Sequence, residues 1–407
     1  MFFEGAGRVA EGRISCIMEA EDTKMEGLLN ASAYIFGEGV KKVNIGFDGE
    51  KVAYIGGSAE GISPLLDVPT GATVVPGFID EHIHGAGGAD VMDGTASALE
   101  TISDCLAKEG TTAFLATTMT ESREHIKKAL QAVKIAACKG AFSGARVLGA
   151  HLEGPFISAR QVGAQPIKYV EKPSIERFNE YNEAAGGTIK MVTLAPETAG
   201  GVALVKYLSE KGVAASIGHS DARYADIVTA VKSGAKSVTH TFNAQSGVHH
   251  REIGVAGSAL LLDDLNCEMI CDTVHVSVPA IRLALKCKSA DKFTLITDSM
   301  RAKGLPDGES ELGGQKVFVK NGEARLTDGT LAGSVLKMND AVKNLVTKCG
   351  VPFCDAIDCA TVAPAKNIGV FDTYGSIAVG KAADLTVLDD DFNVLLTIVG
   401  GRVVYRK

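Results

Sequence analysis

Hydrophobic and polar positions change their period twice along the chain. Between residues 27 and 73, short β-prone runs are separated by glycines, and Asp48-Gly49 favours a hairpin turn. From residue 75 to about residue 360, short apolar runs alternate with amphipathic stretches of helical period, which is typical of parallel βα units. A two-residue period returns after Ser376. The pattern predicts a small β domain, a long α/β domain and a final group of strands.

Eight apolar runs in the central region have the length of parallel strands. They lie at 73–80, 112–117, 147–152, 190–194, 214–218, 237–241, 268–271 and 293–297. Helical patterns lie at 98–108, 121–138, 201–211, 224–233 and 278–286. Eight such units favour a closed barrel of the TIM type over an open sheet. A glycine-rich stretch, 305–333, predicts a hairpin insertion with a loop, and helices are expected at 334–348 and 353–360.

The alternating runs at 383–388 and 402–405 could pair with the N-terminal strands. Residues 1–26 are polar and weakly patterned, which indicates a lead segment or an irregular strand. We therefore expect an α/β protein with a TIM-like (β/α)8 barrel at residues 75–372. A small β-sandwich domain would be built from both chain ends, 1–74 and 373–407. A chain of 407 residues that is 46% hydrophobic can fill both cores.

Charge and composition narrow the possible partners. A net charge of -8 without a basic stripe argues against nucleic-acid binding, although a few local residues could still hold a small anion. No run of eighteen apolar residues and no signal-peptide pattern occurs, so we expect a cytoplasmic protein without a membrane span. The nine cysteines form no CxxC pair and are expected to be reduced. A small-molecule partner is favoured.

The unusual polar residues fall where the predicted strands end. They are His82, His84, Glu153, His219, His240, His275 and Asp298. In TIM barrels the chemistry lies at the C-terminal ends of the strands, so this placement predicts one shared site.

His82 and His84 lie on the same side of an extended chain, about 7 Å apart, and could share a cation, although such pairs also occur as surface or supporting residues. Glu153 could instead brace a loop, and His219 and His240 could be core histidines. We favour metal ligation for all five, because a carboxylate that faces four imidazoles has a cation as its natural partner.

Two further residues complete the predicted centre. His151 lies one step deeper on the same strand as Glu153, and we interpret it as a supporting residue rather than a ligand. Asp298 follows a strongly apolar strand, where a carboxylate would need a cation or a proton. Imidazole and carboxylate ligands without thiolate fit zinc, iron(II), manganese or cobalt, with zinc or iron preferred. Such a cation makes hydroxide available near neutral pH, so the implied reaction class is metal-assisted hydrolysis.

Several motifs carry a family resemblance. The Pro-Gly-Phe-Ile-Asp run at 76–80 with His-x-His, the strand-end Asp298, and Gly-Lys-Ala-Ala-Asp-Leu at 380–385 resemble the amidohydrolase superfamily. Within it, the chain is similar to the N-acetylglucosamine-6-phosphate deacetylases. The more specific motifs are HLEGPF at 151–156, TLAPE at 193–197, GHS at 218–220, THTFNA at 239–244, DTVHV at 272–276 and LAGS at 331–334.

The resemblance implies roles for these residues. Glu153, His219 and His240 would hold one divalent metal ion, and Asp298 would be the catalytic acid/base. His82 and His84 would hold a second ion that Glu153 bridges and Asp298 touches, giving one or two ions per subunit. His275 would orient the substrate and polarise its acetyl carbonyl. The implied substrate contacts are Ala164, Gln165, Asn243, Ala244, Arg251, His275, Leu331, Ala332 and Gly333, in a homo-oligomer that is a dimer or tetramer.

Three positions leave questions about the substrate. Arg251 offers planar donors suited to a phosphate, but it could equally pair with Glu252. Gln165 stands where many relatives have histidine, and Gln245 where methionine is common. Glutamine can hydrogen-bond a sugar or a phosphate without carrying charge, so these two positions bear on selectivity and pH dependence.

The predicted activity is metal-dependent hydrolysis of the acetamide of N-acetylglucosamine 6-phosphate, with glucosamine 6-phosphate and acetate as products. Alternatives are an amidohydrolase that acts on a different N-acetylated sugar phosphate or a cyclic amide, and a non-catalytic sugar-phosphate sensor. Cyclic-amide enzymes resemble one another in a carboxylated lysine on strand four, and here Lys190 lies at the wrong end of that strand. Asp298 argues against a sensor, because binding alone needs no proton-transfer group.

Overall fold

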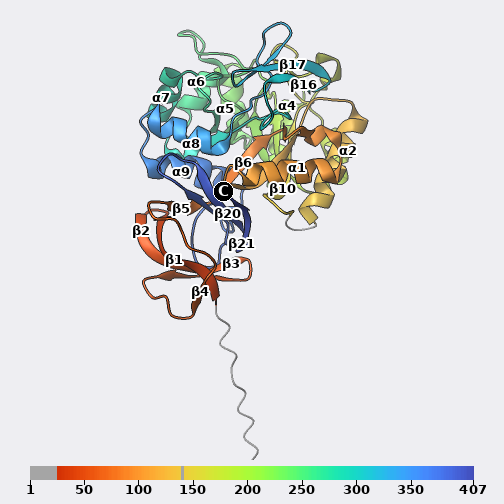
Figure 1. Ribbon diagram of the computed structural model, residues 1–407. Coiled ribbons are helices and arrows are strands. Elements are labelled where there is room, and N and C mark those ends of the chain that lie inside the picture. Colours follow the sequence, from red (N-terminus) through yellow and green to blue (C-terminus); the bar gives the residue numbers. More distant parts are fainter. Residues whose placement is uncertain (1–24, 139–141) are drawn as a thin grey trace, which may run out of the picture.

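The computed structural model describes residues 25–138 and 142–407, and Figure 1 shows a large α/β body above a smaller β body. Most of the predicted lead segment, 1–26, lies outside the described residues. Within the described part, no helix combines the length and apolar character needed to cross a membrane.

Eight parallel strands form the barrel, in the sheet order β15-β14-β13-β12-β11-β10-β9-β6. They are β6 (Phe78–Ile83), β9 (Thr111–Thr118), β10 (Arg146–Glu153), β11 (Ile189–Leu194), β12 (Ala214–Ile217), β13 (Ser237–Val238), β14 (Asn266–Ile270) and β15 (Phe293–Ile296). β15 lies next to β6, and the amide of Asp298, just past the end of β15, donates to the carbonyl of His82 in β6 at 2.8 Å. The predicted TIM-like barrel is confirmed.

The helices surround this barrel (Figure 1). They are α1 (Ala96–Ala107), α2 (Arg123–Cys138), α3 (Ile175–Ala184), α4 (Gly201–Glu210), α5 (Tyr224–Lys232), α6 (Gly254–Leu261), α7 (Val278–Cys287), α8 (Met338–Thr347), α9 (Phe353–Ala360) and α10 (Val362–Asn367). Short 3-10 turns lie at Val91–Asp93, Ile167–Tyr169 and Ala290–Lys292. The sequence prediction missed α3, α6 and α10. α6 is almost entirely buried and so lacks an amphipathic period.

The first predicted strand, 73–80, is two strands in the structure. β5 (Thr73–Pro76) belongs to the smaller sheet, and the barrel strand begins at Phe78. Between them Gly77 donates to the Asp384 carbonyl at 2.9 Å, whereas Phe78 donates to the Gly110 carbonyl at 3.1 Å. A side chain at Gly77 would collide with Thr112, so glycine permits this crossing from one sheet to the other.

The smaller sheet also has eight strands and uses both chain ends. Besides β5 it contains β1 (Met25–Ile35), β2 (Gly39–Asp48), β3 (Lys51–Gly56), β4 (Ile62–Pro64), β19 (Leu385–Leu388), β20 (Val394–Val399) and β21 (Arg402–Arg406). β19 pairs antiparallel with β5, which pairs in turn with β1, so the tail joins the N-terminal strands through a strand that the sequence prediction had placed in the barrel. The sheet curls until β3 hydrogen-bonds to residues 380–383, and a separate apolar core lies inside it.

The glycine-rich insertion forms a three-stranded meander rather than one hairpin. Its strands are β16 (Gly308–Leu312), β17 (Gln315–Lys320) and β18 (Glu323–Leu326). A two-stranded ribbon, β7 (Gly85–Ala86) with β8 (Ala89–Asp90), follows the first barrel strand. Leu312 and Val317 of the meander pack with Met119 and Met300, which brings the insertion over the end of the barrel that carries the site.

Candidate metal centre and active site

Three of the predicted site residues have left-handed backbone angles two residues after the end of a strand. The φ angles are 48° at His219, 28° at His240 and 47° at Asp298. Such angles are uncommon outside glycine and cluster at functional sites, because the surrounding structure has to hold them. They end β12, β13 and β15 abruptly and begin the loops of the catalytic face.

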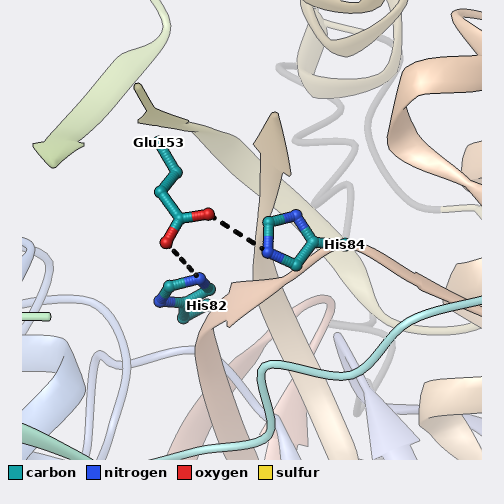
Figure 2. Close-up of side chains that lie close together, drawn as sticks. All are labelled: His82, His84 and Glu153. Atoms are coloured by element: carbon teal, nitrogen blue, oxygen red, sulfur yellow. Dashed lines mark ion pairs between the residues drawn. The ribbon is translucent and has the colours of Figure 1, made fainter. Parts of the chain in front are cut away.

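Glu153, at the end of β10, is the centre of a buried cluster (Figure 2). Its Oε1 lies 3.1 Å from His240 Nε2 and 3.2 Å from His219 Nε2, and its Oε2 lies 3.3 Å from His84 Nε2. His82 Nε2 lies 3.5 Å from Oε1. Two ligand triads therefore share Glu153, one with His82 and His84 and one with His219 and His240. The cluster therefore has enough ligand atoms for one cation, or for two cations that would share Glu153.

The hydrogen bonds of the four imidazoles indicate which ring nitrogen is free. Each Nδ1 faces an acceptor: the Thr117 carbonyl for His84 at 3.2 Å, the Gln161 carbonyl for His219 at 2.8 Å, the Asn243 carbonyl for His240 at 3.1 Å, and the Glu268 carboxylate for His82 at 3.1 Å. Since these oxygens only accept, Nδ1 carries a proton and Nε2 points toward Glu153, where it can take either a metal ion or a second proton.

This donor set fits a metal ion. The Nε2 atoms of His219 and His240 lie 3.2 Å apart, where two lone pairs would repel unless a cation or a proton lay between them. Among the described residues, the buried Nε2 of His82 has no hydrogen-bond partner. Four imidazoles and two carboxylates without thiolate suit a borderline divalent ion.

The carboxylates draw positive charge into the cluster. Burial disfavours the charged form of Glu153, yet His82 and the hydrogen bonds from His219 and His240 outweigh it and hold its pKa well below the usual range. Burial likewise opposes charge on His84, but contacts with Asp298 and Glu153 raise its pKa to about 10. The site therefore favours positive charge, supplied either by protons or by a metal ion.

Asp298 lies beside the His82 and His84 half of the cluster. Its Oδ1 lies 3.2 Å from His84 Nε2 and 3.6 Å from His82 Nε2. Burial opposes its ionisation, but the two histidines outweigh burial and lower its pKa to about 2. The ionised Asp298 faces the cavity and can accept a proton there.

His151 does not hydrogen-bond to Glu153. Its Nδ1 lies 3.2 Å from the Glu81 carbonyl, its Nε2 lies 2.7 Å from Thr193 Oγ1, and its ring packs edge-on against His82. Burial lowers its pKa well below the usual value, so the ring is neutral. It supports the ring of His82 from below, while another residue, Gln165, holds Glu153.

A cavity of about 210 Å³ opens above the cluster. Its lining includes twelve of the predicted site residues: His84, Glu153, Ala164, Gln165, His219, His240, Asn243, Ala244, His275, Asp298, Leu331 and Gly333. The sequence prediction missed Met119, Gly163, Leu312 and Thr330, which also line it. Leu312 comes from the meander. No local sequence pattern predicts that the meander packs over the site.

Three predicted residues do not line the cavity. His82 lies beneath it, and Ala332 is buried with its amide bonded to the Ala324 carbonyl at 3.0 Å. Arg251 is exposed and its guanidinium lies 2.8 Å from His250 Nε2. Within its own chain, therefore, Arg251 is not placed against the cavity.

His275 is held by a residue that the sequence prediction did not single out. Its Nδ1 lies 2.6 Å from Asp272 Oδ2, and Asp272 Oδ1 accepts from the main-chain amides of Val274 and His275 at 2.8 Å. Burial opposes ionisation of Asp272, but His275 outweighs it and lowers the carboxyl pKa. The other ring nitrogen of His275 is left for the cavity, and the short Asp-x-x-His spacing was a usable signal.

The barrel, the strand-end cluster and the cavity define a metal-dependent amidohydrolase. The Amidohydrolase family model matches residues 73–404, and the chain belongs to this family. The N-acetylglucosamine-6-phosphate deacetylase of Bacillus subtilis (strain 168) is 42% identical over 372 residues, which cover 90% of this chain and 94% of that protein.

Two other relatives show the range of the family. The N-acetylgalactosamine-6-phosphate deacetylase of Escherichia coli O157:H7 is 33% identical over 85% of this chain and 93% of its own. A mutant N-acetyl-D-glucosamine-6-phosphate deacetylase from Mycobacterium smegmatis, solved in complex with N-acetyl-D-glucosamine-6-phosphate, superimposes with a TM-score of 0.86 at 30% identity and covers 93% of this chain and 98% of that one.

Proposed function

We propose that this protein hydrolyses the acetamide of N-acetylglucosamine 6-phosphate to glucosamine 6-phosphate and acetate. The observation that carries the proposal is the convergence of the Glu153 cluster, Asp298 and His275 on one cavity. The Bacillus subtilis relative, at 42% identity over most of both chains, supports the choice of substrate.

The proposed cofactor is one or two divalent cations per subunit, zinc or iron by preference. Glu153, His219 and His240 would hold the first ion, and His82 and His84 the second, with Glu153 between them and Asp298 in contact. A cation bound there supplies Lewis acidity, which lowers the pKa of a water molecule and polarises the amide carbonyl.

The chain's own groups would then move the protons. Asp298, which is ionised at neutral pH, takes one proton from the attacking water as its oxygen bonds to the acetyl carbon. The same group returns the proton to the nitrogen as the C–N bond breaks, so the products are acetate and an amine. In its doubly protonated form, His275 donates from Nδ1 to Asp272 and from its other ring nitrogen to the carbonyl oxygen, where it stabilises the charge that develops.

Substrate contacts are proposed for Ala164, Gln165, Asn243, Ala244, Leu331 and Gly333, all of which line the cavity. Ala332 can act only through its neighbours, since its side chain is buried. For Arg251 the phosphate contact stays a proposal, and it requires either that the loop rearranges or that the residue serves the cavity of a second copy of the chain.

We also propose a cytoplasmic homo-oligomer, a dimer or a tetramer, with no nucleic-acid or membrane partner. Exposed apolar side chains lie on or beside α6 and α7, namely Val248, Leu261, Val274 and Leu283. Burying such side chains against a second copy would be favourable. Light scattering after size-exclusion chromatography measures the subunit number directly.

The second candidate is the same hydrolysis on N-acetylgalactosamine 6-phosphate, which the name of the Escherichia coli relative favours. Acetate release from both sugar phosphates, from unphosphorylated N-acetylglucosamine and from a cyclic amide separates the alternatives. We expect the highest kcat/KM for N-acetylglucosamine 6-phosphate and a loss of activity after chelation. Equal rates with the unphosphorylated sugar would exclude a decisive phosphate contact. Binding of the sugar phosphate without acetate release would favour the non-catalytic sensor.

A further inference from the structure

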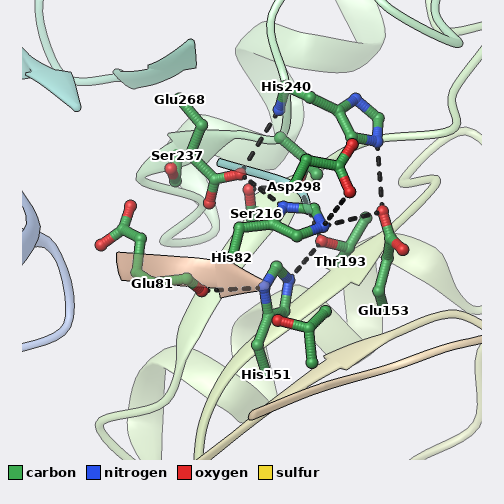
Figure 3. A network of polar contacts seen from close by, with 12 residues as sticks. Glu81, His82, His151, Glu153, Thr193, Ser216, Ser237, His240, Glu268 and Asp298 are labelled. Atoms are coloured by element: carbon green, nitrogen blue, oxygen red, sulfur yellow. Dashed lines mark hydrogen bonds and ion pairs between the residues drawn. The ribbon is translucent and has the colours of Figure 1, made fainter. Parts of the chain in front are cut away.

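Glu268 is a buried carboxylate that neither the cavity nor the predicted site includes. It lies in the middle of β14, is fully buried, and points toward His82 and the backbone of His240 (Figure 3). Its neighbours in sequence within the strand are apolar or small, and an ionised carboxylate in such a place is costly unless it serves a partner.

One oxygen of Glu268 serves two different parts of the metal centre. Oε2 lies 3.1 Å from His82 Nδ1 and accepts from the main-chain amide of His240 at 3.3 Å. Oε1 has no hydrogen-bond partner among the described residues. The carboxylate therefore makes all of its hydrogen bonds through the oxygen that faces His82 and His240.

The hydrogen bond fixes the tautomer of His82. Because the carboxylate oxygen only accepts, a proton stays on Nδ1, and Nε2 is the nitrogen that faces Glu153 Oε1 and Asp298 Oδ1, at 3.5 and 3.6 Å, where a metal ion would bind. A carboxylate behind the imidazole also makes Nε2 a stronger donor toward a metal ion. The Nδ1 atoms of the other three histidines bond to main-chain carbonyls, whereas Nδ1 of His82 bonds to a carboxylate oxygen.

We propose that Glu268 is a positioning residue that sets the affinity of the metal ion held by His82 and His84. The inference rests on the proposed two-ion centre and adds a determinant of the second ion's occupancy. It assigns Glu268 to the metal centre through His82, without direct contact with the substrate.

A rival arrangement would use Glu268 itself as a ligand, since His82, His151 and Glu268 also bring three ligand atoms together. His151 argues against it. Its Nδ1 donates to the Glu81 carbonyl and its Nε2 accepts from Thr193, so the neutral ring has no free lone pair. The positioning role needs no such rearrangement.

The test measures zinc binding to the full-length protein, first depleted of metal by chelation, by calorimetry and by the zinc content after dialysis against buffered zinc. We expect two ions in the wild type. Glu268→Gln keeps an acceptor oxygen without the charge and should weaken the second ion about tenfold, whereas Glu268→Leu removes the acceptor and should weaken it about 100-fold. The first ion should keep its affinity to within a few-fold.

Glu81→Gln is the matched control. Glu81 is an equally buried barrel carboxylate, but its side chain bonds Asn367 at 2.7 Å rather than an imidazole, so both ions should bind as in the wild type. The proposal would be overturned if the second ion bound to Glu268→Gln with an affinity within twofold of wild type, or if the wild type bound only one ion. If the Leu variant does not fold, the Gln variant decides the question. Acetate release by the wild type is scored separately, so failure of the proposed activity would be seen independently of the metal count.

Discussion

The side-chain amide of Gln165 donates to Glu153 Oε2 at 2.6 Å, and its oxygen accepts from the Thr120 main-chain amide at 2.8 Å. The second bond fixes which end of the amide faces the carboxylate. Gln165 therefore holds one oxygen of Glu153 in place and leaves the other to His219 and His240. Gln165 thus orients Glu153 while still lining the cavity.

Replacing Gln165 with alanine should weaken metal binding about tenfold, because Glu153 loses the group that orients it. The Thr120 amide, left without a partner, should cost about 1–3 kcal/mol of unfolding free energy. Metal titration and urea unfolding measure the two effects. Gln245→Met is a matched control: both amide atoms of this buried glutamine lack partners among the described residues, so its loss should leave metal binding unchanged and stability equal or higher.

Asp298→Asn should lower kcat by about 10²–10⁴-fold, because the amide cannot take a proton from water or return one to the leaving amine. His219 and His240 do not depend on Asp298, so the first metal ion should remain bound. Single-turnover acetate release and zinc analysis on the same preparation check both statements. A rate near that of the wild type would remove Asp298 from the mechanism.

Asp272→Asn should lower kcat by about 10–10³-fold with little change in metal content. The amide lacks the negative charge that stabilises the doubly protonated ring of His275, so the hydrogen bond to the carbonyl oxygen should weaken as charge develops on that oxygen. Steady-state kinetics with the sugar phosphate measure the effect. Unchanged kcat with a raised KM would instead assign His275 to ground-state binding.

Lys303 and Glu109 form a buried ion pair, so removing one partner should lower the free energy of unfolding considerably. Nζ lies 2.6 Å from Oε1, and both side chains are almost fully buried. Lys303→Met should cost about 3–5 kcal/mol of unfolding free energy, because a buried carboxyl group loses its partner. The double variant with Glu109→Leu should recover most of that loss. Urea unfolding of both single variants and of the double variant decides, and additive losses would mean that the pair is not coupled.

Asp384 should make stability depend on pH. Burial raises its pKa from 3.8 to about 6, despite Arg146 and the Gly400 amide. The folded state therefore holds this proton more tightly, and the contribution, up to about 3 kcal/mol, is present below pH 4 and lost as pH rises to about 6. Asp384→Asn keeps an acceptor for Gly400 and should flatten this slope. Urea unfolding between pH 4 and 6.5 compares the variant with the wild type.

The sequence predicted those features that have a local signal. Buried parallel strands are continuous apolar runs, so β9 to β15 were located to within a few residues, and ligands at strand ends could be recognised because each interrupts such a run. Strand β13 proved shorter than predicted because the chain leaves the ladder before His240 takes its left-handed angle.

The features that were missed depend on distant contacts. The role of Gln165 requires the fold to bring it to Glu153, and the bond between His82 and Glu268 joins residues 186 positions apart. A glutamate in the middle of an apolar strand was nevertheless a visible signal. The exposure of Arg251 and the cover provided by the meander come from loop conformation, which no periodicity encodes.

Gly77 joins β5 to β6, so only five residues separate the small sheet from His82. Fixing the protein to a solid support through the residues next to β1 or β21 would load that sheet, and part of the strain would pass along this stretch of backbone into the strand that carries His82. Attachment through the outer surface of α2 avoids this path. For an immobilised catalyst, the tether belongs on the barrel's outer helices and away from the strands at the chain ends.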